Sequence, residues 1–230
     1  MEIKGVLLDL DDTLWPVAPV IAGAEQVLQQ WITTHLPQVA ADYSTDRLRQ
    51  RRQALVATDP RFEYDLWALR FALLQQVFAE YGAEAMAMAT PAMEVFAHAR
   101  NQVALYDDVR PGLQALAERF ELGTVSNGFA DLQAIGLAPF FRVSIAARHY
   151  GAAKPAAGIF HAACAELKLE PAQVLYVGDD PLLDVQGAQQ AGLRAAWMNR
   201  HARDLLSEQH VSHVKPDMVV SDLHDLLQKL

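Results

Sequence analysis

The sequence predicts an α/β protein in which a parallel sheet carries helices on both faces and an all-helical domain is inserted after the first strand. Two observations lead to this class. From about residue 109 onward, short apolar runs alternate with segments of helical periodicity, which is the order of elements in a parallel sheet wrapped by helices. Between about residues 20 and 103, apolar residues recur only at helical spacing.

The first strand is expected at Val6-Leu7-Leu8, because a short apolar run of this kind is typical of a buried parallel strand. We expect it to join the sheet formed by the later strands, which makes the helical segment an insertion. Pro16 and Pro19 break the chain after this strand. The expected domains are a sheet domain at residues 1–15 and 109–230 and a helical domain at residues 16–108.

Four or five helices are expected in the insertion. The first carries an apolar stripe between Ala24 and Ile32. The sequence Ser44-Thr45-Asp46 is suited to cap the second. A third carries apolar stripes between Leu66 and Phe78 and ends near Gly82, and Pro91 opens a fourth.

The rest of the sheet domain alternates between strands and helices. The expected strands lie at residues 122–125, 143–146, 174–177, 195–198 and 218–220. The expected helices lie at residues 111–120, 131–135, 155–167, 185–191 and 223–229. Helices between successive strands are the crossover connections that a parallel sheet requires.

Composition and charge exclude several classes of protein. The chain has 230 residues, 52% of them hydrophobic, which suffices for a core without disulfides. Its 19 Lys and Arg against 28 Asp and Glu give a net charge of −9, which argues against nucleic-acid or membrane binding but leaves room for a local cationic pocket. The single Cys164 fits a cytoplasmic location, and we expect no signal peptide or membrane span. His210 and His213 lack a third ligand, so we expect a surface loop there.

Polar and charged residues follow the predicted strands where those strands end. Ligands of an open parallel sheet bind beyond the carboxyl ends of its strands. The segments expected there are Asp9–Thr13, Ser126–Gly128, Lys154-Pro155 and Gly178–Asp184. They bring carboxylates, a hydroxyl group and an ammonium group to one edge of the sheet.

Asp9, Asp11, Asp179 and Asp184 would crowd one small space. Carboxylates that close cannot all stay ionised without a compensating charge. A hard divalent cation supplies that charge, and oxygen ligands suit Mg²⁺. Because Mg²⁺ in turn favours a phosphate partner, the sequence predicts a magnesium site for phosphate chemistry.

The remaining polar residues are suited to hold phosphate. Ser126 and the main-chain amides of Asn127 and Gly128 can bind phosphate oxygens, and Lys154 adds a positive charge. Taken singly, each segment has a plainer explanation as a helix cap or a turn. Jointly, four segments in order carry complementary groups, which favours phosphoryl transfer.

These four segments resemble the motifs of the haloacid dehalogenase superfamily of hydrolases, and the resemblance covers the whole chain. The motifs are, in order, Asp9-Leu10-Asp11-Asp12-Thr13-Leu14, Thr124-Val125-Ser126-Asn127, Ala153-Lys154-Pro155, and Gly178-Asp179 with Asp184. Asp12 stands where many members have glycine, and Leu183 where asparagine is frequent. The resemblance implies a Rossmann-like core and a helical cap.

The resemblance also implies a role for each residue. Asp9 would be the nucleophile that forms an aspartyl-phosphate, and Asp11 the general acid and then the base. Thr13 would steady the loop, while Ser126 and Lys154 hold the phosphoryl group. Mg²⁺ would be held by the side chains of Asp9 and Asp179, the main-chain carbonyl of Asp11, and Asp184 directly or through water.

Asp11 also separates branches of the superfamily, since dehalogenases lack an acid at this position. The resemblance therefore points to a phosphatase acting on a small phosphorylated metabolite. A phosphomutase on a sugar phosphate and a non-catalytic member of the fold are the alternatives, although a non-catalytic protein would be expected to have lost at least one site residue. We expect a monomer or homodimer that binds neither nucleic acid nor membrane.

Trp67, Arg70 and Phe71 share one face of an expected helix in the insertion. They are either two core aromatics beside a surface arginine, or an aromatic wall and a cation that face a flat, charged substrate. The stretch from Trp67 to Phe71, together with the fourth motif, also resembles bacterial flavin mononucleotide phosphatases. That resemblance implies flavin mononucleotide or a riboflavin-pathway phosphate as substrate.

Two further features each have two interpretations. Arg47, Arg49, Arg51 and Arg52 either form a solvated helix face or attract an anionic substrate. Trp15 either lines the entrance to the site or anchors the linker to the insertion.

Overall fold

The computed structural model describes residues 2–204 and 211–230 and contains two compact units. The sheet unit comprises Met1–Pro16, Ala104–Gly128 and Gly136–Leu230, and the helical unit comprises Val17–Val103 and Phe129–Ile135. This division differs from the expected domains, residues 1–15 and 109–230 and residues 16–108, at Pro16 and at two longer segments. Residues 104–108 group with the sheet unit, and Phe129–Ile135 groups with the helical unit, where Phe129 lies 6.3 Å from the ring of Phe96.

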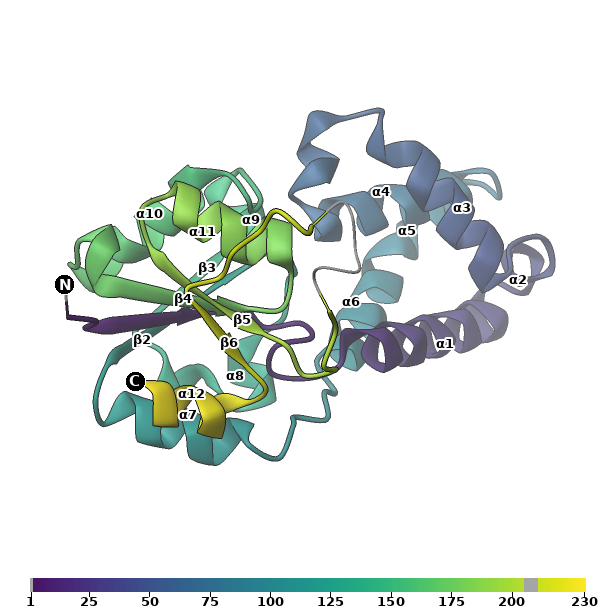
Figure 1. Ribbon diagram of the computed structural model, residues 1–230. Coiled ribbons are helices and arrows are strands. Elements are labelled where there is room, and N and C mark those ends of the chain that lie inside the picture. Colours follow the sequence, from purple (N-terminus) through teal and green to yellow (C-terminus); the bar gives the residue numbers. More distant parts are fainter. Residues whose placement is uncertain (1, 205–210) are drawn as a thin grey trace. The chain divides into compact units, whose positions relative to one another are not determined.

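The sheet has six strands, all parallel, in the order β3-β2-β1-β4-β5-β6 (Figure 1). Their bounds are β1 Gly5–Leu8, β2 Glu121–Ser126, β3 Val143–Ala146, β4 Val174–Gly178, β5 Arg194–Met198 and β6 Met218–Val220. The N-terminal strand β1 lies at the centre and is wholly buried, with β2 and β4 on its two sides. The strand order reverses there, so the switch point at which such sheets bind ligands follows β1.

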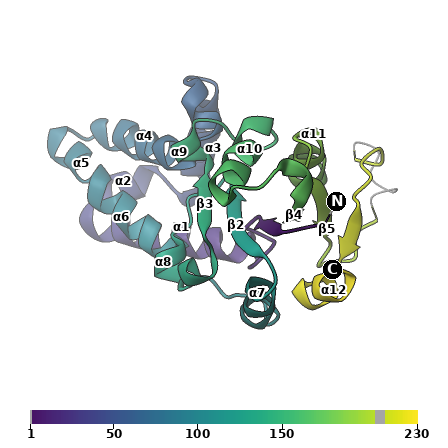
Figure 2. The same cartoon turned by 90° about the vertical axis from the view of Figure 1, so that its left-hand side faces the viewer.

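Helices cover both faces of the sheet, which confirms the predicted fold class. Figures 1 and 2 show α10 (Ala157–Leu167) and α11 (Gly187–Gln190) on one face, and α7 (Val109–Ala117) and α12 (Leu223–Lys229) on the other. The unit also contains α9 (Ala147–Tyr150), two 3₁₀ turns (η2, Ala138–Phe140; η3, Pro171–Gln173) and a π-helix (η4, Pro181–Gln186). The sequence predicts an α-helix over residues 185–191, and the π-helix occupies the first part of that stretch.

The helical unit is built on four long helices and several short ones. Its helices are α1 Val17–His35, α2 Pro37–Asp42, α3 Thr45–Val56, α4 Leu66–Ala79, α5 Ala83–Ala87, α6 Ala89–Arg100 and α8 Leu132–Ile135, with a 3₁₀ turn (η1) at Pro60–Glu63. Ser44 caps α3 as predicted, since its hydroxyl accepts from the Arg47 amide at 3.4 Å. Helix α6 begins two residues before Pro91.

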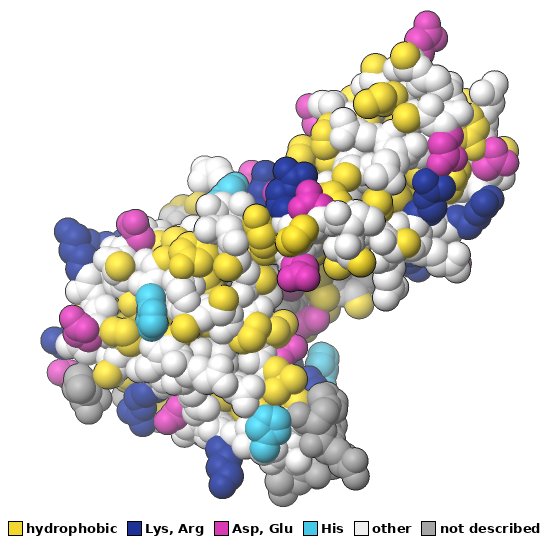
Figure 3. Space-filling view, turned by 90° about the horizontal axis from the view of Figure 1, so that it is seen from above, with side chains coloured by type: hydrophobic (Ala, Val, Ile, Leu, Met, Phe, Trp, Pro, Cys, Tyr) yellow, Lys and Arg dark blue, Asp and Glu magenta, His cyan; other side chains and the backbone are white. Residues whose placement is uncertain are grey.

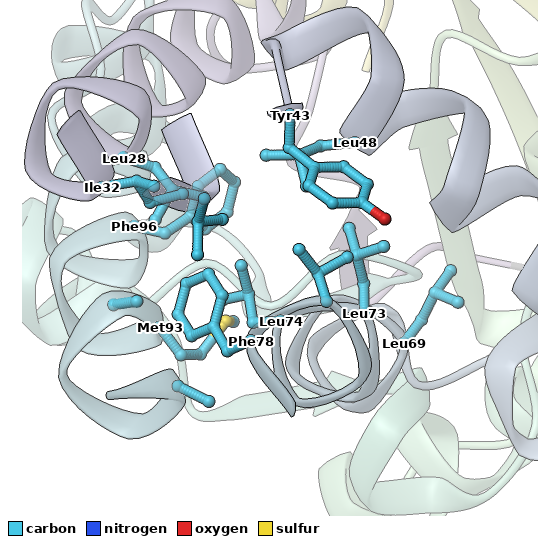
Figure 4. Packing of buried hydrophobic residues seen from close by; sticks show 14 of the residues in the cluster. Leu28, Ile32, Tyr43, Leu48, Leu69, Leu73, Leu74, Phe78, Met93 and Phe96 are labelled. Atoms are coloured by element: carbon cyan, nitrogen blue, oxygen red, sulfur yellow. The ribbon is translucent and has the colours of Figure 1, made fainter. Parts of the chain in front are cut away.

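The core of the helical unit forms where α1, α4 and α6 meet. Figure 4 shows Leu28 and Ile32 of α1 beside Phe96 of α6, and Leu74 and Phe78 of α4 beside Met93. These side chains are all nearly or completely buried, so the unit has its own apolar core rather than borrowing one.

The surface carries both signs of charge. On the face shown in Figure 3, basic and acidic side chains lie interspersed, and neither sign forms a continuous field. Among the described residues, no helix has the length and apolar character needed to cross a membrane.

A buried ion pair joins three distant segments of the sheet unit. Arg200, after β5, forms a bidentate pair with Asp108 at 2.9 and 3.0 Å, and the Asp108 carboxylate also accepts from the amide of Leu223 at 2.8 Å. The Arg200 Nε donates to the main-chain oxygen of Thr13 at 2.8 Å. Burial raises the pKa of Asp108, but the hydrogen bonds from Arg200 and Leu223 outweigh it and hold the pKa below its ordinary value.

Replacing Asp108 by asparagine leaves the buried Arg200 guanidinium without its anionic partner. We expect Asp108→Asn to lower the free energy of unfolding by about 3 kcal/mol at neutral pH, measured by urea denaturation. Because folding lowers the pKa of Asp108, the ionised carboxylate stabilises the wild type, and this stabilisation is lost as the pH falls through the folded-state pKa. The free energy of unfolding of the variant should not show this fall. Asp225→Asn, in a solvent-exposed helix pair with Lys229, is the matched control and should cost no more than about 0.5 kcal/mol. Equal costs for the two variants would contradict the structural role of the Asp108 pair.

Candidate active site

Four segments of the sheet unit meet beyond the carboxyl ends of β1, β2 and β4. They enclose a pocket of about 210 Å³. Its lining residues are Asp9, Asp11, Asp12, Ser126, Asn127, Gly128, Lys154, Asp179, Asp180, Leu183 and Asp184. The structure therefore brings together the sheet-domain residues that the sequence singles out, apart from Thr13, which lies buried in the adjoining loop.

Lys154 is the centre of the contacts in this pocket. It is 5% exposed, and its ammonium group donates to Asp9 Oδ1 at 2.5 Å, Asp184 Oδ1 at 2.6 Å and the hydroxyl of Tyr176 at 2.9 Å. Burial lowers the pKa of Lys154, but the carboxylates of Asp184 and Asp9 outweigh it and hold the pKa well above its ordinary value. The lysine is therefore a fixed positive charge.

Three carboxyl groups, those of Asp9, Asp179 and Asp184, lie near this single positive charge. Burial raises the pKa of Asp9 to about 7, and the neighbouring Asp184 adds to the rise while Lys154 opposes it. Burial, together with Asp9 and Asp184, raises the pKa of Asp179 to about 8. Each of the three offers an oxygen within 4.8 Å of the others. Three carboxylate oxygens beside one lysine are a donor set that fits a hard cation, whose charge would hold the carboxylates ionised.

The loop after β4 is shaped by its own carboxylates. Asp180 caps the π-helix by accepting from the amides of Leu182 and Leu183, both at 2.8 Å. Asp184 folds back over the strand end, where its Oδ2 accepts from the Asp180 amide at 2.9 Å. A Cβ on Gly178 would lie 2.3 Å from that Oδ2, so only glycine allows the Asp184 side chain to reach Lys154.

The loop after β1 is a closed turn. Asp12 has φ of +61°, a left-handed conformation that glycine adopts most readily and that aspartate tolerates better than most other residues. The indole of Trp15 donates to Asp11 Oδ1 at 2.8 Å. Thr13 is fully buried, and its hydroxyl has no hydrogen-bond partner among the described residues. Its main-chain amide donates to the carbonyl of Leu10 at 3.3 Å, and its main-chain oxygen accepts from Arg200 at 2.8 Å.

Ser126 and Asn127 hold the loop at the end of β2. Ser126 Oγ accepts from the amide of Gly128 at 3.0 Å. The side-chain amide of Asn127 makes two hydrogen bonds to the main chain of Lys154, at 2.8 and 3.1 Å. The sequence predicts a role only for the main chain of Asn127, whereas in the structure its side chain fixes the segment that carries the lysine.

Two aromatic residues that support the site were missed. The hydroxyl of Tyr176 accepts from Lys154 and donates to the carbonyl of Val125 at 2.8 Å. Trp197 donates to the carbonyl of Asp179 at 2.8 Å. The sequence does contain a signal for them, since each is an aromatic residue with a polar group in an otherwise apolar strand. A buried Tyr or Trp of this kind needs a hydrogen-bond partner.

The candidates in the helical unit form internal contacts. Trp67 and Phe71 stack with ring centroids 5.0 Å apart. Arg70 is 6% exposed, lies 3.7 Å from the ring centroid of Phe96 and pairs with the buried Glu25 at 3.3 Å. It is therefore not a surface arginine, because its charge is taken up inside the unit.

The four arginines of α3 also have partners within the unit. Arg49 and Arg52 pair with Glu25, at 2.6 and 3.7 Å. Arg47 and Arg51 both lie over the ring of Tyr43, and Arg51 pairs with Glu80 at 2.9 Å. These contacts favour a structural role. Of the two C-terminal histidines, His213 lies 3.1 Å from the amide nitrogen of Gln186, and His210 lies outside the described residues.

The sequence also matches known proteins. It is 29% identical over 228 residues to the 5-amino-6-(5-phospho-D-ribitylamino)uracil phosphatase YigB of Escherichia coli (strain K12), an alignment that covers 98% of this chain and 95% of that protein. It is 31% identical over 211 residues to the glyceraldehyde 3-phosphate phosphatase of Methanopyrus kandleri, covering 86% and 84% of the two chains.

Among solved structures, the crystal structure of a 2-haloacid dehalogenase from Pseudomonas syringae pv. tomato DC3000 superposes with a TM-score of 0.90 and 36% sequence identity, over 98% of this chain and 97% of that one. The family model for haloacid dehalogenase-like hydrolases matches residues 3–192, which span all four segments of the pocket. The chain thus belongs to the haloacid dehalogenase-like hydrolases.

Proposed function

We propose that this hydrolase is a magnesium-dependent phosphatase that cleaves a small phosphate monoester through an aspartyl-phosphate on Asp9. The observation that carries the proposal is the pocket itself, which places a second carboxylate, Asp11, beside Asp9 together with Ser126 and Lys154. The phosphatase names of the curated relatives support the same reaction class.

The metal ion would be held by the carboxylates of Asp9, Asp179 and Asp184, with the main-chain carbonyl of Asp11 as a further ligand. When bound, Mg²⁺ supplies positive charge that offsets these carboxylates and the phosphate oxygens. Lys154 supplies a second positive charge, which two carboxylates and a tyrosine hydroxyl hold at the pocket.

The reaction then takes two steps. A carboxylate oxygen of Asp9 attacks phosphorus, and the ester P–O bond breaks with its electron pair on the leaving oxygen, which takes a proton from Asp11. In the second step Asp11 accepts a proton from water as the water oxygen attacks phosphorus. The P–O bond to Asp9 breaks, and the carboxylate and inorganic phosphate are released.

Asp11 favours this reaction over dehalogenation. A halide leaves without a proton, so a dehalogenase has no use for an acid beside its nucleophile. A sugar or ribityl alkoxide is a strong base and needs one. The similarity to a solved 2-haloacid dehalogenase therefore supports a shared fold and nucleophile rather than a shared substrate.

The proposed substrate is flavin mononucleotide or a riboflavin-pathway phosphate. The activity for which the Escherichia coli relative is named supports this class, since its substrate joins a heterocycle to a phosphorylated ribityl chain. We propose that the helical unit acts as the cap and that Trp67 and Phe71 contribute to recognition of the heterocycle. Arg70 is less suited to that task because Glu25 and Phe96 already engage it.

Asp9→Asn should abolish turnover while leaving the fold intact. The amide keeps the shape of the side chain but cannot attack phosphorus, so we expect kcat to fall by roughly 10⁴ or more. In the wild type, acid quenching during turnover of labelled substrate should trap a hydroxylamine-sensitive phosphate on the protein, and the variant should trap none. Retention of a tenth of the wild-type activity by a folded variant would contradict the proposed nucleophile.

Removal of metal should abolish activity, and Mg²⁺ should restore it. Ca²⁺ should be a poor substitute, because its longer bonds and higher coordination number misplace Asp9 for attack. A second measurement does not depend on activity: Mg²⁺ should raise the Tm of the wild type but not of Asp179→Asn. Full activity in excess chelator would overturn the metal assignment.

The substrate class is tested by kcat/KM across a panel. We expect flavin mononucleotide and 5-amino-6-(5-phospho-D-ribitylamino)uracil to rank above glyceraldehyde 3-phosphate and glucose 6-phosphate, phosphorylated casein to rank last, and 2-chloropropionate to release no halide. Flavin substrates ranking no higher than sugar phosphates would remove the flavin assignment but leave the phosphatase.

Variants of two stacked indoles separate recognition from packing. Trp67→Ala should lower kcat/KM for flavin mononucleotide about tenfold more than for glucose 6-phosphate. Trp31→Ala, which removes an indole stacked on His35 at 4.4 Å in the same unit, is the control and should leave that ratio unchanged. Equal ratios in both variants would show that Trp67 does not select the substrate.

A further inference from the structure

We propose that Trp15 is a positioning residue that fixes which oxygen of Asp11 exchanges the proton in catalysis. The proposal rests on the proposed phosphatase function, in which Asp11 is the acid and base. Its structural basis is the hydrogen bond of 2.8 Å from the Trp15 indole nitrogen to Asp11 Oδ1, which closes the turn after β1.

The indole is held rigidly enough to act in this way. Trp15 is 0% exposed, so its ring is enclosed on all sides. Its main-chain oxygen accepts from the amide of Asp12 at 2.7 Å, within the same turn. The neighbouring Leu14 donates to the carbonyl of Leu10 at 2.8 Å and accepts from the amide of Tyr106 at 3.1 Å. The turn and the indole therefore form one fixed body.

The chemistry of the indole bears on which oxygen of Asp11 carries the exchangeable proton. An indole N–H is a donor only, with no lone pair available to accept a proton from a carboxylic acid. Asp11 Oδ1 must therefore be the acceptor of this bond whether Asp11 is charged or neutral. The carbonyl oxygen of a neutral carboxyl group accepts hydrogen bonds more strongly than its hydroxyl oxygen does, so this bond favours Oδ1 as the carbonyl oxygen. The proton that Asp11 gives to the leaving oxygen, and later takes from water, is then carried by Oδ2.

This arrangement also reduces the number of orientations open to the carboxyl group. Loss of the indole donor removes the hydrogen bond that holds Oδ1, so the carboxyl group has more orientations open to it and the acid proton is correctly placed less of the time. General acid catalysis depends on a donor held within hydrogen-bond reach of the leaving atom. A phenylalanine keeps most of the bulk of Trp15 but provides no donor.

A simpler alternative is that Asp11 merely satisfies a buried indole, since a buried N–H needs a partner. The two explanations differ in what the loss of the hydrogen bond does to the reaction. Mispositioning of the acid slows substrates whose leaving group needs a proton and spares those whose leaving group does not. A loss of packing slows both kinds alike.

The test uses two substrates of similar shape, 4-nitrobenzyl phosphate and 4-nitrophenyl phosphate. The first releases a strongly basic alkoxide, and the second a stable phenolate that needs no proton. Single-turnover release of the alcohol or phenol reports the first step alone. For Trp15→Phe we expect alcohol release to fall on the order of 10²-fold, while phenolate release changes less than about threefold. Asp11→Asn sets the scale for complete loss of the acid.

A second replacement guards against misfolding of Trp15→Phe. Incorporation of 3-benzothienylalanine at position 15 replaces the ring N–H by sulfur and retains the shape of the indole, and we expect the same selectivity between the two substrates. Trp31→Phe is the control and should slow neither. Equal slowing of both substrates by the folded Trp15 variants, or no slowing of either, would overturn the proposal. Failure of the wild type to cleave either phosphate would instead refute the phosphatase function.

Discussion

The arrangement of the pocket depends on the ammonium group of Lys154, which two carboxylates far apart in the sequence share. It draws together Asp9, after the first strand, and Asp184, in the π-helix after the fourth. All three side chains are buried, so each of these charges is stabilised there by the others. Gly178, Asn127 and Tyr176 each serve this contact, by making room for Asp184, by fixing the main chain of the lysine and by accepting its third hydrogen bond.

The same contact leaves a deficit of positive charge. Asp179 adds a third carboxylate near the pair, and burial raises its pKa to about 8. The protein alone therefore favours a partly protonated cluster, and a cation would shift it toward the ionised form that a nucleophile requires. In the proposed mechanism, binding of the metal therefore also ionises the Asp9 carboxylate that attacks phosphorus.

Much of the fold and of the candidate site is predictable from the sequence, because the patterns that indicate them lie within short segments. The strands at 143–146 and 218–220 and the helix at 223–229 have the predicted bounds, and each motif follows a strand. Other features depend on contacts between distant residues. In the π-helix, Asp184 pairs with Lys154, 30 residues away, and the buried Arg70 pairs with Glu25, which lies 45 residues before it. Tyr176 looks like any core aromatic until its hydroxyl is seen between Lys154 and Val125.

The grouping of Phe129–Ile135 with the helical unit bears on how this protein can be rearranged. Its chain crosses between the two units four times rather than twice, because this short segment leaves the sheet unit directly after Gly128 and returns at Gly136. Phe129 packs with Phe96 and Arg100, and the Asp131 amide donates to Asn101 at 3.0 Å. Joining Pro16 directly to Ala104 would remove the partners of the Phe129 ring and of the Asp131 amide. The helical unit is thus not encoded by one continuous insertion. Exchanging it between relatives requires Phe129–Ile135 to be exchanged together with Val17–Val103.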